Sequence, residues 1–119
     1  MIELLDMGSP KAIGMVISGK IERPDIDKVY ARIKEQLTLV DKISVYVEVD
    51  QFKGISLDAL IEDAKLGIPL IKKLEKKAVV SSAKWLEVFA KVGDKLLPSI
   101  EAKHFVPEQK EEAKAWVKA

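Results

Sequence analysis

Residues 77–119 read KAVVSS at 77–82, WLEVF at 85–89, IEAKHF at 100–105 and PEQ at 107–109, and a charged segment then ends in AWV at 115–117. The first and third stretches have the length and composition of short strands. The second carries apolar residues at helical spacing, and the proline at 107 opens a further helical segment. The order strand, helix, strand, helix predicts a parallel sheet that is covered by helices.

Size and composition bound the class of protein. A chain of 119 residues makes one domain spanning 1–119, with 48% hydrophobic and 33% charged residues, a balance typical of globular proteins. The net charge of +1 gives no strong positive electrostatic field, so we do not expect the protein to bind nucleic acid. The chain has no cysteine, which excludes disulfides and thiol catalysis. Acidic residues at 3 and 6 and the lack of a long apolar run predict a cytoplasmic protein without stable membrane insertion.

The first half of the chain predicts three strands and a helix. Residues 2–5 and 12–18 are strand candidates separated by Gly8-Ser9-Pro10, and their close spacing predicts an antiparallel start. Pro24 and Asp25 open a helix, because proline suits the first turn and an acid suits the positive end of the helix dipole. The alternating residues 43–49 predict a third strand that stops at Asp50.

Two more helices are predicted in the middle of the chain. Ser56 suits the N-cap of a helix with apolar residues up to Ile71, although Pro69 should kink it. A lysine cluster follows, which we expect to offset the negative pole of that helix; a membrane-binding patch is the alternative. The cluster comprises Lys72, Lys73, Lys76 and Lys77. A third helix runs over residues 83–97 and stops at Pro98, so the whole chain predicts five strands and four helices.

Several short motifs, in this order and spacing, match a known family over nearly the whole chain. They are Met1-Ile2-Glu3-Leu4, Gly19-Lys20-Ile21, Val47-Glu48-Val49-Asp50 before Phe52-Lys53-Gly54, Ala78-Val79-Val80 before Lys84-Trp85-Leu86, and Phe105 followed by residues 111–117. On these residues the chain resembles the SpoIIAA-like family, small bacterial proteins related to STAS domains and to the CRAL-TRIO lipid-transfer fold. The resemblance implies a single-domain (βα) superhelix with a mostly parallel five-stranded sheet and an antiparallel first strand.

In STAS domains that antagonise anti-sigma factors, a phosphorylatable serine follows an aspartate at the start of the helix after the third strand, and the resemblance implies a corresponding position in this chain. Asp50 stands at the corresponding place here. Gln51-Phe52-Lys53 follows it instead of hydroxyl residues, and Ser56 is the nearest substitute. The chain therefore departs from the pattern of a kinase-controlled switch.

A candidate anion site follows from the predicted sheet, because sites in open α/β sheets form at the carboxyl ends of the strands. Hydroxyls, lysines and the free backbone donors of helix N-termini suit an anion or a phosphoryl group. The simpler interpretation is that the serines only cap helices. The candidate residues are Asp50, Lys53, Ser56, Ser81, Ser82 and Lys84.

No motif for catalysis, a metal or a cofactor is present. His104 is the only histidine and has neither a cysteine nor a second histidine as a metal-binding partner, so a structural role is the simpler interpretation, with acid–base chemistry as the alternative. The glycines are scattered and form no phosphate loop. We therefore expect a non-enzymatic protein without a cofactor.

Apolar residues beyond one helical stripe suggest a second contact, since one stripe per helix suffices to cover a sheet. These residues could form a homodimer interface, a lipid-binding groove or a transient membrane contact; a wide core stripe is the simpler alternative. The first hypothesis is a STAS-like module that binds itself or a regulatory protein, and the second is a carrier of a hydrophobic small molecule. The residues expected to matter are Leu66, Leu70, Leu86 and Phe89.

Overall fold

The computed structural model describes residues 1–56, 73–82 and 101–119. Five strands, two helices and one short 3-10 helix are present in these residues. In chain order they are β1 (Ile2–Leu5), β2 (Ala12–Ile21), α1 (Arg23–Gln36), β3 (Ile43–Ile55), β4 (Leu74–Val80), β5 (Glu101–Phe105), η2 (Pro107–Gln109) and α4 (Lys110–Lys118). Both predicted helices of the middle of the chain fall outside the described residues.

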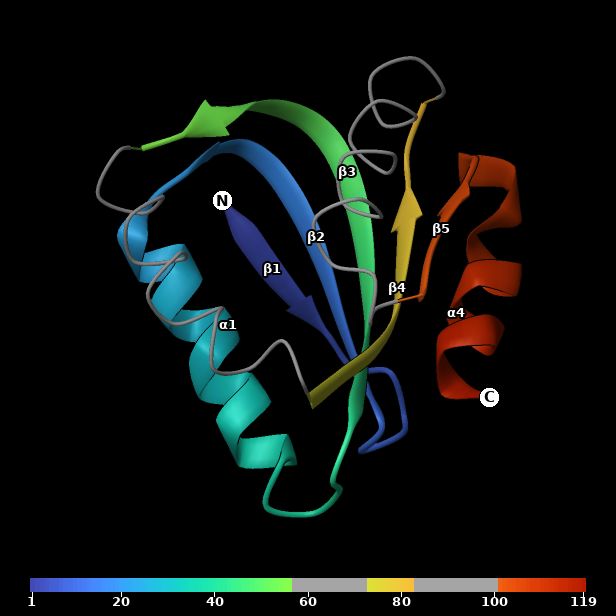
Figure 1. Ribbon diagram of the computed structural model, residues 1–119. Helices are drawn as coiled ribbons and strands as arrows, with labels where there is room; N and C mark the ends of the chain where they lie inside the picture. Colours follow the sequence, from blue (N-terminus) through green and yellow to red (C-terminus); the bar gives the residue numbers. More distant parts are fainter. Residues whose placement is uncertain (57–72, 83–100) are drawn as a thin grey trace.

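The strands form one sheet in the order β1-β2-β3-β4-β5 (Figure 1). β1 pairs with β2 antiparallel, and each later pair is parallel. The prediction of a mostly parallel five-stranded sheet with an antiparallel first strand is therefore confirmed.

Two strands run further than predicted. β2 continues past Ser18 to Ile21, and β3 continues past Asp50 to Ile55. The two strands stay paired to this point, but the register shifts around Gly19, which has a φ of 61°. On β3, Gln51 has a φ of 49°, in the left-handed region that non-glycine residues rarely adopt. The extension is thus an irregular parallel ribbon, and the prediction that the third strand stops at Asp50 is wrong.

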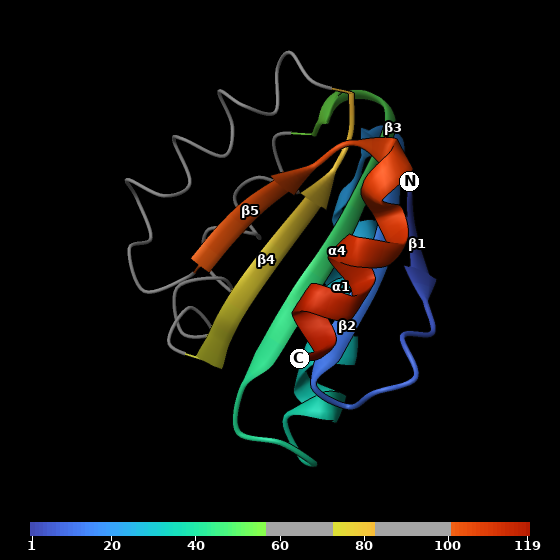
Figure 2. The same cartoon turned by 90° about the vertical axis from the view of Figure 1, so that its right-hand side faces the viewer.

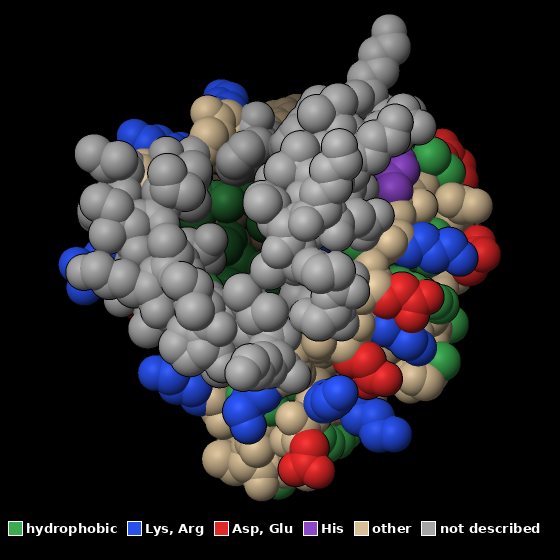
Figure 3. Space-filling model, in the orientation of Figure 1, with side chains coloured by type: hydrophobic (Ala, Val, Ile, Leu, Met, Phe, Trp, Pro, Cys, Tyr) green, Lys and Arg blue, Asp and Glu red, His purple; other side chains and the backbone are tan. Residues whose placement is uncertain are grey.

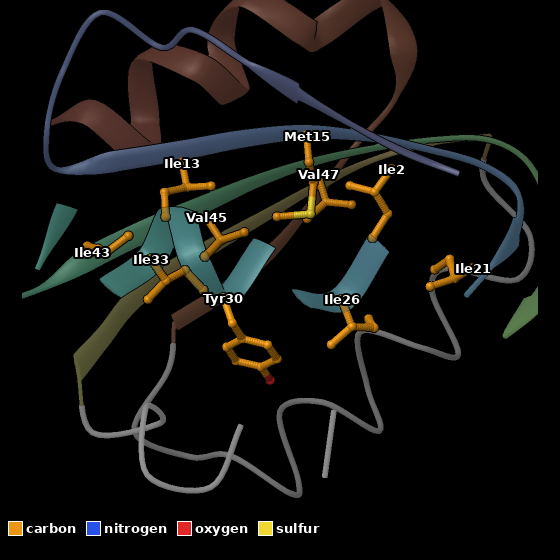
Figure 4. Close-up of a cluster of buried hydrophobic side chains, with 10 residues drawn as sticks. All are labelled: Ile2, Ile13, Met15, Ile21, Ile26, Tyr30, Ile33, Ile43, Val45 and Val47. Carbon is orange, nitrogen blue, oxygen red and sulfur yellow. The ribbon is translucent and has the colours of Figure 1, made fainter. Parts of the chain in front are cut away.

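Helix α1 lies on one face of the sheet, on the side of β1 and β2 (Figure 1). Its buried residues recur at positions 26, 30 and 33, which is the spacing of one helical stripe. They join the odd-numbered residues of β2 and β3 because alternate strand residues point to the same face. Figure 4 shows this cluster, which comprises Ile2, Ile13, Met15, Ile21, Ile26, Tyr30, Ile33, Ile43, Val45 and Val47.

Helix α4 covers the opposite face and contacts β4 and β3 (Figure 2). Ala113 and Val117 point inward from the helix. The apolar side chains of this second cluster come from six elements or loops and are Met7, Ala12, Tyr46, Ala78, Val80, Phe105, Ala113 and Val117. The described residues therefore form a three-layer arrangement, with α1 and α4 on the two faces of the sheet.

Lys76 and Lys77 lie within β4, so the prediction that they end the second helix is wrong for these two residues. Lys76 instead contacts the C-terminal end of α4 from strand β4. Its Nζ donates to the carbonyl oxygens of Trp116 at 3.2 Å and Ala119 at 3.4 Å and lies 5.4 Å from the centre of the Trp116 ring. The Trp116 carbonyl oxygen also accepts the backbone N–H of Ala119 at 3.3 Å, so Lys76 adds a cation at the negative end of the helix dipole.

Asp25 joins the start of α1 to the edge of the sheet. Its carboxylate accepts hydrogen bonds from the backbone N–H of Glu22 at 2.9 Å and of Ile2 at 3.1 Å, and the Met1 ammonium lies 3.8 Å away. Burial raises the pKa of this carboxyl, but the two hydrogen bonds and the nearby cations outweigh it, so the pKa is lowered below 3.8. The folded state therefore favours the ionised form.

Replacing Asp25 by asparagine should lower the free energy of unfolding by about 1 kcal/mol at neutral pH, because one charge-assisted hydrogen bond is lost. A lowered pKa stabilises the protein above the ordinary value of 3.8, and this contribution disappears as the pH falls through the lowered pKa. The difference in the free energy of unfolding between wild type and Asp25→Asn should therefore disappear at acidic pH. Urea unfolding at about pH 7 and about pH 3 measures it.

Asp27 provides the matched control. It forms a 4.0 Å pair with Arg23, and both side chains are more than half exposed, at 53% and 55%. Exposed pairs of this kind contribute little. Asp27→Asn should therefore leave the stability nearly unchanged at both pH values, and an equal loss in the two variants would contradict the role assigned to Asp25.

Candidate functional site

The predicted anion site is divided between two places at the carboxyl ends of the strands. Pairing of β3 with β4 ends at Glu48 and Val80, whereas β3 continues with β2 and bends away from β4 (Figure 1). Asp50 lies in this ribbon opposite Ser18, and Lys53 is exposed further along it. The described strands therefore carry these two residues away from the end of β4.

Ser56 follows the ribbon directly. It is half-buried, and its backbone N–H donates to the carbonyl oxygen of Ile21 at 2.8 Å. Lys84 lies outside the described residues, as do Leu66, Leu70, Leu86 and Phe89. An anion site at these positions and phosphorylation of Ser56 stay predictions.

Ser81 and His104 meet at the carboxyl ends of the neighbouring strands β4 and β5. His104 pairs in register with Val79, and Ser81 follows two residues later, so both side chains share one face. The Oγ atom of Ser81 lies 3.5 Å from Nε2 of His104. The backbone N–H of Ser81 also donates to the carbonyl oxygen of Phe105 at 3.1 Å, which holds the end of β4 against β5.

The hydrogen bonds of Ser81 decide what this pair can do. The hydroxyl donates its one proton to the carbonyl oxygen of Ser82 at 2.8 Å. At the contact with His104 the oxygen must therefore accept, and the ring nitrogen donates. A nucleophilic serine needs the opposite arrangement, in which histidine accepts the hydroxyl proton. The sequence indicated Ser81 and His104 separately, and only the sheet register brings them together.

A second polar group lies on the opposite face, under α4. The hydroxyl of Tyr46 donates to Oε1 of Glu48 at 2.6 Å, and Lys110 lies 3.8 Å from the other carboxylate oxygen. Tyr46 is fully buried. Burial, the hydrogen bond to Glu48 and the charge of Glu48 raise the pKa of Tyr46 far above its ordinary range. The i, i+2 spacing of Tyr46 and Glu48 in a strand was the available sequence signal.

Two further findings concern the described part of the chain. Residues 1–56, 73–82 and 101–119 contain no group of three side chains that could hold a metal ion. Among the same residues, no helix is long and apolar enough to cross a membrane.

Comparison with known proteins identifies the family. The chain resembles an uncharacterised protein from the DUF3478 family with a SpoIIAA-like fold, from Shewanella loihica PV-4, with a TM-score of 0.77 and 22% identity over 98% of this chain and 92% of the other. No curated protein matches. The model of the SpoIIAA-like family matches residues 12–118. The chain therefore belongs to the SpoIIAA-like family.

Proposed function

We propose that this protein is a non-enzymatic, STAS-like binding module that works in the cytoplasm. In this proposal it presents an apolar helical surface to a second copy of itself or to a regulatory protein. The surface comprises Leu66, Leu70, Leu86 and Phe89. Membership of the SpoIIAA-like family and the sheet topology support this reading.

One observation carries the non-enzymatic part of the proposal. Among the described residues, Ser81 and His104 are a serine and a histidine in contact. The Ser81 hydroxyl, however, donates its proton to the backbone carbonyl of Ser82 and not to the histidine. Two other polar groups hold secondary structure elements together: Asp25 joins α1 to β1, and Glu48 joins Tyr46 to Lys110 of α4. These roles favour binding over catalysis.

Two acidic substitutions test the self-association. Leu66→Asp and Leu86→Asp should each convert a dimer to a monomer, because an unpaired charge in an apolar interface is costly. Native mass spectrometry gives the oligomeric state, and circular dichroism shows whether the variant still folds. Folded variants that remain dimeric, or a wild type that is monomeric at all concentrations, would refute self-association through this surface.

Leu39→Asp is the matched control for these variants. Leu39 lies in the turn after α1 and is 71% exposed. The Leu39→Asp substitution makes the same change of charge and volume outside the proposed surface. This variant should therefore remain dimeric. Loss of the dimer in all three variants would mean that the added charge acts non-specifically.

A second candidate function is a carrier or sensor of a hydrophobic small molecule. The face of β3 and β4 that points to the α1 side is apolar at Val45, Val47 and Val79, and it ends in the polar pair Ser81–His104. Hydrophobic side chains of the described residues are visible on this side of the molecule, and so is the histidine (Figure 3). The three valines are buried, and apolar side chains that end in a polar pair are the usual lining of a site for amphiphilic molecules. Denaturing extraction of natively purified protein should release a stoichiometric lipid-like compound if this function is correct.

A further inference from the structure

The two edges of the described sheet differ in how their outer backbone groups are used. β1 forms one edge and β5 forms the other (Figure 2). On β1, the N–H of Ile2 donates to the carboxylate of Asp25 at 3.1 Å, and its carbonyl oxygen accepts from Nζ of Lys28 at 2.8 Å. Both side chains come from α1. An incoming strand would have to displace them, so α1 protects this edge against further pairing.

The outer backbone groups of β5 have no such cover from the described residues. The carbonyl oxygen of Phe105 accepts the N–H of Ser81 at the end of β4 at 3.1 Å, so the backbone groups of Phe105 point toward β4. Because this direction alternates along a strand, those of Ala102 and His104 point to the outer side. In the part of the chain that the structure describes, no residue is bonded to them there. Such a row of unpaired groups is a template for another strand.

The charges of β5 match a reversed copy of the same strand. Glu101 and Lys103 are exposed and lie two residues apart, so they share one face of the strand. A lysine on an edge strand usually discourages pairing, because like charges opposite each other are unfavourable. In an antiparallel pair centred on Ala102, however, Glu101 lies opposite Lys103 of the second copy, and Lys103 lies opposite its Glu101. Both contacts then join opposite charges.

Both charged side chains are placed for this contact. Lys76 is the cross-strand neighbour of Glu101, but its Nζ is bonded to carbonyl oxygens of α4. Glu101 forms no ion pair with any residue in the described ranges. Nζ of Lys103 lies 5.1 Å from the centre of the Phe105 ring and 5.7 Å from that of Trp116. The lysine therefore leans over the α4 face and leaves the outer backbone groups of β5 uncovered.

We propose that β5 pairs antiparallel with β5 of a second copy of this chain, centred on Ala102, so that the two sheets join into one. A two-fold axis perpendicular to the sheet produces this arrangement, because it reverses the strand and makes the contact the same on both copies. The N–H and carbonyl groups of the two Ala102 residues exchange hydrogen bonds, and two Glu101–Lys103 pairs flank them. This contact lies outside the helical surface of the proposed function and goes beyond that function.

Charge reversal tests both the pairing and its register. Glu101→Lys and Lys103→Glu each turn two attractive contacts into two repulsive ones, so each variant alone should raise the dissociation constant of the dimer about thirtyfold. The two variants mixed in equal amounts should form a heterodimer, because one chain then carries two lysines at the contact and the other carries two glutamates. Native mass spectrometry at low ionic strength, with one variant labelled with 15N, distinguishes the heterodimer from both homodimers.

Two further variants make the test specific. Glu3→Lys makes the same charge reversal at an exposed position of β1, the edge that α1 protects, and should leave the dimer intact. Ala102→Pro removes the outer N–H without removing a bond to β4 and should abolish the dimer. Circular dichroism shows whether each variant folds. A folded Glu101→Lys variant that dimerises as tightly as wild type, or two reversed variants that do not associate when mixed, would overturn the proposal.

The outcomes also separate this contact from the helical surface. If Leu66→Asp and Leu86→Asp abolish the dimer and the charge variants keep it, pairing of β5 is refuted and the proposed function stands. The reverse result supports pairing of β5 and refutes self-association through the helical surface. A tetramer that either set of variants reduces to dimers supports both contacts, and a wild type that is monomeric at all concentrations refutes both.

Discussion

Phe105→Ala should lower the free energy of unfolding by about 3–5 kcal/mol, the usual cost of emptying an aromatic site in a packed core. Phe105 is 2% exposed on β5, pairs in register with Val80, and its ring centre lies 5.9 Å from that of Trp116. The ring therefore joins the edge strand to α4. Urea unfolding followed by far-UV circular dichroism measures the loss.

Two control variants make this prediction specific. Phe105→Leu retains most of the apolar volume and should cost less than about 1.5 kcal/mol. Leu39→Ala removes a leucine that is 71% exposed and should change the stability by less than about 0.5 kcal/mol. A Phe105→Ala variant as stable as Leu39→Ala would contradict the packing of α4 against β5.

Gly14→Ala should cost about 1–3 kcal/mol, because the added methyl group overpacks a filled site. A Cβ at this position on β2 would clash with Sδ of Met7 and would lie 2.9 Å from Cγ of Met7 and 3.2 Å from Cβ of Leu5. The glycine is required here by space and not by its backbone conformation. The sequence alone offered no reason for a glycine inside a buried strand.

A double-mutant cycle identifies the cause. In a Met7→Ala background the clash with the thioether is absent, so the cost of Gly14→Ala should fall to below about 0.5 kcal/mol. Gly8→Ala is the control: Gly8 has a φ of 70° with nothing within 4 Å of an added Cβ, so its cost is conformational and should not depend on Met7. A Gly14→Ala cost that is independent of Met7 would show that the contact with Met7 is not its cause.

The candidate site shows where prediction from sequence fails. The sequence indicated Ser81 as a candidate anion ligand at a strand end and His104 as a lone histidine, but their contact depends on the register between β4 and β5. Asp50 was expected at the end of a strand, because acids are rare inside strands. The prediction failed because β2 continues to pair with β3 up to Ile55, and this partner is distant in the sequence.

Local pattern determined the class of fold. The alternation of Ile43, Val45 and Val47 gives β3 one apolar face, and the spacing of Ile26, Tyr30 and Ile33 gives α1 one apolar stripe. Both patterns follow from the geometry of a single strand or helix. A chain with such segments in alternating order must bury them in a sheet covered by helices.

Tertiary structure alone decided the contacts between distant residues. Lys76 lies in β4 because its backbone hydrogen bonds are made by strand pairing. Its side chain contacts the end of α4 because carbonyl oxygens lie there within reach of Nζ. Tyr46 and Glu48 met Lys110 because α4 returns to the face of β3. These contacts join residues far apart in the chain, and their geometry is set by packing and register, which no local pattern encodes.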